Sequence, residues 1–335
     1  MCIIEAPWRH QQGWFHELGH VYIVHSNYTE KLRLFQICVN FELMYVSEFY
    51  KKIFGCKVYK ISLDAGCTCP TRDGTKGNRG CIFCNQSGSG DFAASRNKSI
   101  SEQIEDAKKL VAGKMKNPER KFIAYFQNFT NTYGDPKRLS SLYNEAVSSK
   151  DVCGISIATR PDCLNEEILQ SIKSLCDKTF VQIEFGLQTA NEKSAEFIRR
   201  GFPLKPSLEA VKQVRNTDSR IHIVTHVIFG LPEEKSEDMM NTVRLVCETS
   251  DGIKISCLHI LRGTDLFELY ENGYVKILEE EEYYDLLGKA LEIIPKDFVI
   301  HRLTGDGAKK ILAAPLWTAN KRKVHNEIAS RFGVF

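Results

Sequence analysis

Six apolar stretches alternate with helical ones from residue 56 onward, and this alternation limits the possible folds more than any other feature. The stretches are rich in β-branched and aromatic residues, as strands are, and they span 56–65, 121–126, 153–159, 179–186, 220–230 and 253–261. Strands that alternate with helices predict a parallel sheet with helices packed outside it. Because the stretches are apolar nearly throughout, we expect both faces of the sheet to be covered. The sequence therefore predicts an α/β fold, either an open doubly wound sheet or a complete or partial (β/α) barrel.

Recognisable start signals precede three of the expected helices. Ser99 and Glu102 form an S-x-x-E capping box. Asp135 stands before a proline, and Asn165 precedes two glutamates that suit the positive end of a helix dipole. A basic helix is expected from Thr318.

The composition indicates an ordinary globular protein. Of the 335 residues, 43% are hydrophobic and 26% are charged, and the net charge is +3. Such a charge does not by itself indicate a nucleic-acid binder, although it is compatible with a local basic surface. The sequence shows neither a signal-peptide pattern nor an apolar run of about 18 residues. We therefore expect a cytoplasmic protein without membrane association.

Four of the twelve cysteines crowd into one short segment, as Cys67, Cys69, Cys81 and Cys84. In a reducing compartment, clustered cysteines bind metal more often than they form disulfides. A structural zinc would use all four thiolates in a closed tetrahedron. An iron–sulfur cluster held by three of them would keep one iron open for chemistry. The loop follows the first expected strand, where α/β folds place their sites, and both metals remain open on these residues alone.

The segment before the first strand contains HELGH at residues 16–20, which matches the H-E-x-x-H motif of zinc proteases. Few residues precede it, Gly19 weakens the required helix, and no further ligand follows at a suitable spacing. We interpret the match as coincidental.

Several motifs in the right order carry a resemblance to a known family. They are KVYKISLDAG, RDGTKG, GCIFCN and GSGDFA, with C-x11-C between Cys69 and Cys81. This pattern resembles the radical S-adenosylmethionine (SAM) superfamily, and within it the YhcC/YtqA-like family, which is related to the radical SAM domain of the Elongator catalytic subunit. The resemblance implies a partial (β/α)6 TIM-like barrel over 44–262. It also implies a C-terminal α/β extension over 263–335 that is largely helical and completes the substrate side, with 1–43 as an appendage.

The resemblance also implies the cofactors. Cys69, Cys81 and Cys84 would ligate a [4Fe–4S] cluster, with Cys67 as a neighbour rather than a ligand. A reductant such as flavodoxin or ferredoxin would supply one electron, and SAM would be cleaved to methionine and a 5′-deoxyadenosyl radical. The cofactors would carry that chemistry, and the protein would bind and orient them.

Residues at the ends of the strands are expected to bind SAM or act on the substrate. The cofactor-binding candidates are Gln127, Thr130, Asn131, Thr159, Arg160, Glu184, Gln188, Arg200 and Gly230. Among these, Arg200 would pair with the SAM carboxylate, or would be an exposed helix charge. The catalytic candidates are Glu184, Arg302 and Asp306, and the last two belong with His301 and Thr304 to a polar segment that would line the substrate pocket or form a buried network.

The resemblance to the Elongator domain points to a wobble-uridine side chain of transfer RNA as the substrate. Basic clusters that suit phosphates lie in the cysteine segment (Arg72, Lys76, Arg79), at 114–121 and at 321–323. Such clusters are also common on solvated helix faces. The alternatives are a radical SAM enzyme for a small metabolite or protein, and a non-enzymatic zinc module. No binding to DNA is expected.

Overall fold

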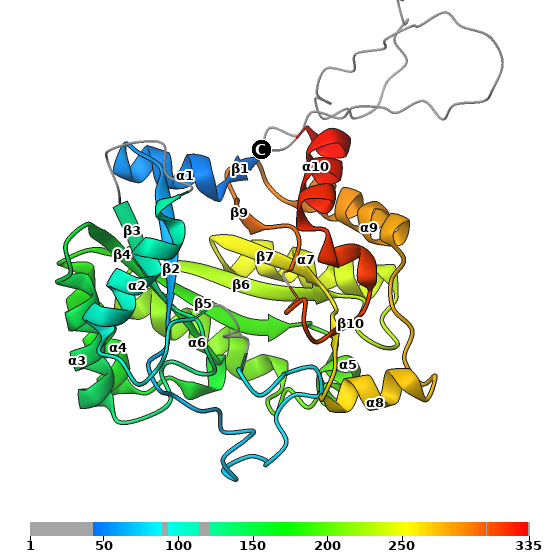
Figure 1. Cartoon of the computed structure of the whole chain (residues 1–335), viewed down its shortest axis with the longest axis horizontal. Coiled ribbons are helices and arrows are strands. Elements are labelled where there is room, and N and C mark those ends of the chain that lie inside the picture. Colours follow the sequence, from blue (N-terminus) through cyan, green and yellow to red (C-terminus); the bar gives the residue numbers. More distant parts are fainter. Residues whose placement is uncertain (1–42, 89–92, 114–120, 306, 334–335) are drawn as a thin grey trace, which may run out of the picture.

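A computed structural model of the chain describes residues 43–88, 93–113, 121–305 and 307–333 (Figure 1). The HELGH motif, the catalytic candidate Asp306 and residues 114–120 of the second basic cluster lie outside the described residues. Within them, no helix is long and apolar enough to cross a membrane.

The core of the fold is one sheet of eight strands with the order β1-β9-β7-β6-β5-β4-β3-β2, in which all neighbours run parallel. The strands are β1 (Met44–Tyr45), β2 (Val58–Leu63), β3 (Lys121–Phe126), β4 (Val152–Thr159), β5 (Phe180–Gln188), β6 (His222–Phe229), β7 (Gly252–Cys257) and β9 (Val299–Arg302). From β2 to β7 the order never reverses, so right-handed crossovers place the connecting helices on one face. The doubly wound alternative is therefore wrong. The edge strands β1 and β2 do not pair with each other, which makes the curled sheet a partial barrel, as predicted.

The helices between the strands form the outer layer. They are α2 (Ile100–Ala112), α3 (Pro136–Val147), α4 (Glu166–Cys176), α5 (Glu192–Phe197), α6 (Leu204–Thr217) and α7 (Ser236–Thr249). The expected N-caps are confirmed: Ser99 and Glu102 form a capping box, and the side chains of Asp135 and Asn165 accept backbone N–H groups of the first turns of α3 and α4.

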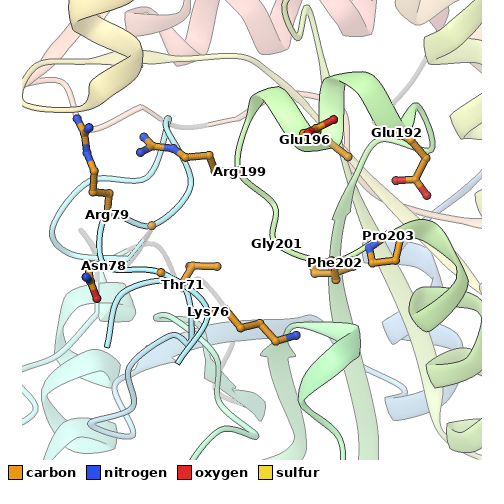
Figure 2. A pocket seen from close by; sticks show the side chains of 13 residues that line it. Thr71, Lys76, Asn78, Arg79, Glu192, Glu196, Arg199, Gly201, Phe202 and Pro203 are labelled. Carbon is orange, nitrogen blue, oxygen red and sulfur yellow. The ribbon is translucent and has the colours of Figure 1, made fainter. Parts of the chain in front are cut away.

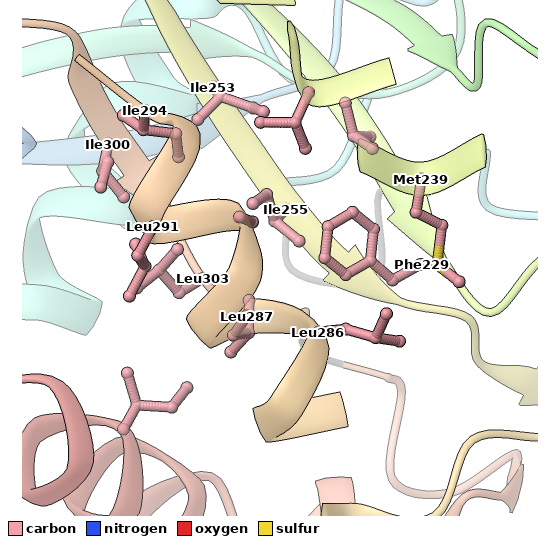
Figure 3. Close-up of a cluster of buried hydrophobic side chains, with 14 of the residues drawn as sticks. Phe229, Met239, Ile253, Ile255, Leu286, Leu287, Leu291, Ile294, Ile300 and Leu303 are labelled. Atoms are coloured by element: carbon pink, nitrogen blue, oxygen red, sulfur yellow. The ribbon is translucent and has the colours of Figure 1, made fainter. Parts of the chain in front are cut away.

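The two faces of the sheet differ in polarity. The outer face is apolar and packs under the helices, as Figure 3 shows for Phe229, Ile253 and Ile255 beneath Leu287 and its neighbours. The inner face carries polar side chains at alternate positions, so that the strands enclose a polar lumen. The expectation of strands that are apolar on both faces is wrong for this reason: only one face is covered by helices.

Helix α1 (Val46–Phe54) closes the N-terminal end of the lumen. It leads from edge strand β1 to the opposite edge strand β2. Phe49 stacks on His222, the first residue of β6, with ring centroids 4.6 Å apart, and its ring also meets that of Phe180, the first residue of β5, at 6.2 Å. His222 Nε2 in turn lies 2.9 Å from His301 Nε2 of β9. The strands therefore begin on an aromatic floor, and the lumen opens at their C-terminal ends.

The C-terminal segment joins the same sheet and adds to its outer layer. It contributes β9, together with α8 (Asp265–Glu271), α9 (Glu280–Ile293), η2 (Leu316–Ala319) and α10 (Lys321–Phe332). A short antiparallel pair, β8 (Ile260–Leu261) with β10 (Leu312–Ala314), links it to the end of β7. Figure 1 shows α10 beside α9, where Lys323 pairs with Glu280 at 2.7 Å.

The histidines of the floor predict how stability depends on pH. Burial lowers the pKa of His222 to about 4 and that of His301 well below its usual range. The unfolded chain takes up these protons near pH 6.5, so their contribution is present above that pH and is lost as the pH falls toward 4. The loss from His222 alone is on the order of 3 kcal/mol.

We expect the urea midpoint to drop between pH 7 and pH 5, and His222→Phe, which can still stack on Phe49, to show a smaller drop. His325→Gln on the exposed side of α10 serves as the control and should behave like the parent. An identical pH dependence for parent and His222→Phe would contradict this account of the floor.

Candidate functional site

The cysteine segment follows β2 at the open end of the lumen and is fixed by hydrogen bonds at its start and along its length. At its start, the Asp64 carboxylate accepts the N–H of Gly66 at 2.7 Å and pairs with Arg96 at 3.1 Å. Further on, Nη2 of Arg72 donates to the carbonyl oxygens of Cys84 and Asn85, both at 2.7 Å. Hydrogen bonds of its own thus fold the segment back on itself.

Three of its cysteines are electrostatic neighbours. Cys84 and Cys81 share a turn, in which the N–H of Cys84 donates to the carbonyl of Cys81 at 3.0 Å. Burial, helped by the neighbouring Cys84 and Cys69, outweighs the effect of Arg160 and Arg72 and raises the pKa of Cys81 to about 12. A thiol in this environment loses its proton only when a metal replaces it. Three neighbouring cysteines on one loop fit the donor set of a [4Fe–4S] cluster.

Cys67 lies apart from the other three. It is buried in the hydrophobic core cluster under the outer helices, and Nη2 of Arg138 lies 3.8 Å from its sulfur. In the part of the chain that the structure describes, no three Cys, His, Asp or Glu side chains surround a single metal-ion position. The thiolates of a cubane cluster each bind a different iron, and therefore need not converge in that way.

Arg160 and Arg200 bracket the ring of Phe202 next to the cysteines. Their guanidinium carbons lie 4.8 and 4.6 Å from its centroid. Arg160 forms a two-point ion pair with Asp162, with N–O distances of 3.0 and 2.9 Å, and donates to the carbonyl of Arg200 at 2.8 Å. The pKa of Arg160 is raised: burial lowers it, and the ion pair with Asp162 outweighs that effect.

Arg200 is almost fully buried, so the interpretation of it as an exposed helix charge is wrong. Its guanidinium donates to the carbonyls of Phe202, Leu187 and Thr189 and pairs with Glu192 at 3.2 Å. These contacts tie the end of β5 to the turn before α6. They do not support the predicted pairing of Arg200 with the SAM carboxylate.

The candidates after β3 and β4 brace the open end of the lumen. Asn131 donates from Nδ2 to the carbonyls of Phe126, Asn128 and Ala158 at 2.8–3.0 Å, and it is fully buried. The N–H of Thr130 donates to the carbonyl of Thr68 in the cysteine segment at 3.2 Å. These two residues shape the loop.

Two further candidates after β3 and β4 lie beside them. The Gln127 side chain accepts a hydrogen bond from Ser62 at 2.9 Å on the inner face. The hydroxyl of Thr159 pairs with that of Thr132. Among the candidates after β3, Gln127 is therefore the one whose side chain is placed to meet a bound molecule.

Gln188 and Gly230 both have backbone conformations that suit sharp turns. Gln188 has φ +70° at a register irregularity next to Gly186, and Gly230 has φ +84°. A Cβ added at Gly230 would lie 2.8 Å from Leu278. In this structure the glycine therefore allows close packing of Leu278.

A buried carboxylate at the centre of the lumen gathers six strand residues around it. Glu184 of β5 is fully buried, and each of its oxygens has three partners. The partners are Lys60, Ser156 and Gln182 for Oε1, and Tyr125, His226 and Lys254 for Oε2. Nζ of Lys60 lies 2.7 Å from Oε1, and the hydroxyl of Tyr125 lies 2.9 Å from Oε2. Strands β2 to β7 each contribute to it.

The charges of this group determine its protonation. Burial alone would raise the pKa of Glu184, but Lys254, Lys60 and His226 lower it well below its usual range. Burial outweighs the opposing effect of Glu184 and lowers the pKa of Lys254 to about 7. Burial also lowers the pKa of His226 to about 4, so this imidazole is neutral at pH 7. The lumen thus holds one carboxylate, a firmly charged Lys60 and a weakly basic Lys254.

The catalytic candidate Arg302 reaches the same lumen. Its Nη2 donates to Ser256 of β7 at 2.6 Å, and its charge acts on the pKa values of Tyr125, His226 and Lys254. Its neighbour His301 instead belongs to the floor. The register between β7 and β9 shifts here: Ile253 pairs with Ile300 and Lys254 with Arg302, which leaves His301 as an extra residue on β9.

Sequence reasoning missed most of the residues around Glu184. Lys60, Tyr125, His226 and Lys254 were interpreted only as parts of apolar strands. The signal that identifies them is period-two alternation within each strand, as in Lys254-Ile-Ser-Cys and in Gln182-Ile-Glu-Phe. In a parallel strand expected to be apolar on both faces, a repeated polar position marks the face that lacks a helix.

A cavity of about 860 Å³ lies beside the cysteine segment (Figure 2). The segment lines one wall with Thr71, Lys76 and Arg79, and the region after β5 lines the other with Glu192, Arg199 and Phe202. In Figure 2 the side chains of Arg79 and Arg199 lie near each other at one end of the cavity. Both pair with Asp265 of α8.

Comparisons with known proteins agree with this geometry. The model of the Radical SAM superfamily matches residues 73–246, and that of the Radical_SAM C-terminal domain matches 250–333. The chain belongs to the radical SAM superfamily. As a radical SAM enzyme, it uses a [4Fe–4S] cluster and SAM as its cofactors, and the superfamily chemistry is reductive cleavage of SAM.

Two curated relatives cover most of the chain. YtqA of Bacillus subtilis is 40% identical over 81% of this chain and 83% of its own length, and YhcC of Escherichia coli is 34% identical over 80% and 85%. Among solved structures, Elp3 of Methanocaldococcus infernus superimposes with a TM-score of 0.59 at 17% identity, over 82% of this chain and 63% of that one. This last likeness supports the fold, and the predicted radical SAM partial barrel is confirmed.

The separation of Cys67 from the other cysteines predicts the outcome of single substitutions. Cys69→Ala, Cys81→Ala and Cys84→Ala should each abolish the cluster, because each removes one of three protein ligands. Cys67→Ala should retain it. Iron and sulfide content after anaerobic reconstitution, together with the visible absorption spectrum, measures the effect. Equal loss of metal in all four variants would show a four-thiolate site instead.

The Glu184 group predicts a large loss of stability from a small change. Glu184→Gln leaves Lys60 and Lys254 without their common anion, which should cost about 3–5 kcal/mol of unfolding free energy. The matched control Glu281→Gln removes an exposed pair with Arg331, and should cost at most about 1 kcal/mol. Urea unfolding at pH 7 compares the two, and similar losses would contradict the central place given to Glu184.

Proposed function

We propose that this radical SAM enzyme modifies a wobble-uridine side chain of transfer RNA. In this proposal Cys69, Cys81 and Cys84 hold the cluster, and a flavodoxin or ferredoxin reduces it. The observation that carries the proposal is the combination of the three grouped cysteines with a polar lumen that opens beside them. The resemblance to the Elongator radical SAM domain supports the choice of substrate.

The architecture suits a substrate that enters from one side only. The aromatic floor around Phe49 and His222 closes one end of the lumen, so a base must enter at the C-terminal ends of the strands. When bound, the cluster supplies the electron that cleaves SAM. The residues of this chain then have to orient the reacting side chain. Gln127 and Arg302, both partly exposed on the inner face, are the candidates for direct contact, whereas the buried Glu184 would act by holding its six partners in place.

The rim of the 860 Å³ cavity is the favoured contact for the RNA backbone. Arg79 and Lys76 are 67% and 40% exposed, and the carboxylate that each pairs with keeps a second partner, an arginine, when a phosphate takes its place. The basic cluster at 321–323 lies on α10 in the outer helix layer, where Lys323 already pairs with Glu280. We therefore favour the cysteine segment over α10 as the phosphate-binding surface.

Two variants with several substitutions each test whether the RNA backbone contacts the cysteine segment or α10. Lys76→Gln with Arg79→Gln should weaken binding of transfer RNA and flatten the plot of log affinity against log salt by about one to two units. The control removes the same kind of charge elsewhere, with Lys321→Gln, Arg322→Gln and Lys323→Gln, and should change both quantities less. If the parent protein shows no salt-dependent binding of transfer RNA, the RNA substrate is wrong.

The substrate itself is tested by comparing modified nucleosides from cells with and without the gene. Loss or accumulation of a wobble-uridine derivative supports the proposal. A different result is that the purified protein contains the cluster and cleaves SAM while deletion of its gene leaves the nucleosides unchanged. That result favours a small metabolite or a protein as substrate. Stoichiometric zinc in place of iron would support the non-enzymatic module.

A further inference from the structure

The lumen contains more positive than negative charge in the part of the chain that the structure describes. Lys60, Lys254 and Arg302 all border it, and Glu184 is the one carboxylate with which any of them pairs there. Both carboxylate oxygens of Glu184 already accept hydrogen bonds from its six partners. Burying this excess of positive charge costs free energy unless an anion binds beside it.

Arg302 is the least satisfied of these cations. Ser256 is its hydrogen-bond partner within the described residues, and its Nε is buried without an acceptor. Arg302 makes no ion pair among the described residues, whereas Lys60 and Lys254 share Glu184. A guanidinium offers a planar fork of N–H donors that matches the two oxygens of a carboxylate. Arg302 therefore presents an open recognition group beside Lys254.

These cations are distinct from those that surround the cysteines. The guanidinium groups near the cysteines include those of Arg72, within the cysteine segment, and Arg160, directly after β4. Lys60, Lys254 and Arg302 instead lie on β2, β7 and β9. The lumen cations therefore form a second electrostatic centre, separate from the proposed cluster site.

We propose that Arg302 and Lys254 form an oxyanion subsite that binds a carboxylate on the reacting end of the substrate. The inference deepens the proposed function and rests on it: the wobble-uridine side chain that enters the lumen would carry an acidic group. A carboxylate at the tip of a base substituent can reach the interior of the lumen. A backbone phosphate is flanked by two sugars and stays at the rim.

The neighbours of Lys254 give the subsite a measurable proton signature. It is faced by Lys60 of β2, Tyr125 of β3, Glu184 of β5, His226 of β6 and Arg302 of β9. Burial lowers its pKa to about 7. An anion bound nearby favours the ammonium form, so binding at pH 7.5 should take up a proton.

The first experiment uses the cluster-containing enzyme with SAM bound, so that the SAM site is filled. Acetate is the probe, and acetamide is its neutral counterpart, both observed by saturation-transfer NMR. Acetate should bind and acetamide should not. Arg302→Gln should weaken acetate binding at least about tenfold, because a charge-assisted hydrogen-bond pair is lost. The affinity of Arg302→Lys for acetate should lie between those of the parent and Arg302→Gln, since lysine keeps the charge without the planar fork of donors.

The matched control is Arg262→Gln, an exposed arginine beyond β8 that should leave acetate binding unchanged. Circular dichroism of each variant confirms folding. Equal acetate binding by the parent and Arg302→Gln would overturn the proposal, as would equal binding of acetate and acetamide or binding of neither.

The second experiment separates this inference from the proposed function. Calorimetry measures the binding of transfer RNA that carries 5-carboxymethyluridine at the wobble position and of the same RNA that carries the carboxamide. Repeating the titrations in buffers of different ionisation enthalpy gives the number of protons taken up on binding. Tighter binding of the acid with proton uptake, lost in Arg302→Gln, supports both proposals. Acetate binding that depends on Arg302, without any binding of transfer RNA, retains the subsite and overturns the RNA substrate. Binding of both RNAs alike, without proton uptake, retains the RNA and overturns the subsite.

Discussion

The carboxylate of Glu184 is the interaction on which the rest of the structure depends. A carboxylate removed from water is costly, and it persists here because six donors on six consecutive strands surround it. The same contacts connect β2 to β7 across the inner face, where no helix can pack. In a half-barrel this replaces the apolar core that fills a closed barrel. The inner face is thus held together by polar contacts and stays open to a polar guest.

Local features of this fold were predictable from the sequence, and features that depend on distant pairing were not. The strand at 121–126 and the caps at Ser99, Asp135 and Asn165 follow from short-range rules and are confirmed. The pairing of β1 with β9 joins Met44 to Val299, and no local pattern indicates it. The contact of Lys60 with Glu184 spans 124 positions for the same reason.

The candidate site shows the same division. The grouping of Cys69, Cys81 and Cys84 follows from their spacing on one loop. The fate of Arg200 does not, because its carbonyl acceptors at Leu187, Thr189 and Phe202 become available only once β5 has ended and the chain has turned. A polar residue near a cofactor can bind the cofactor or build the wall beside it, and only three-dimensional contacts distinguish the two.

Helix α1 has a consequence for the depth of the lumen. This helix of nine residues lies in the connection between the two edge strands, β1 and β2, and it seals the floor with Phe49 and Tyr50. The two edges are therefore linked by one helix where the strands begin. Because Phe49 packs against the first residues of β5 and β6, α1 and not the loops at the mouth sets the depth of the lumen. Substrates of different bulk at the mouth would then present their reacting ends at the same level.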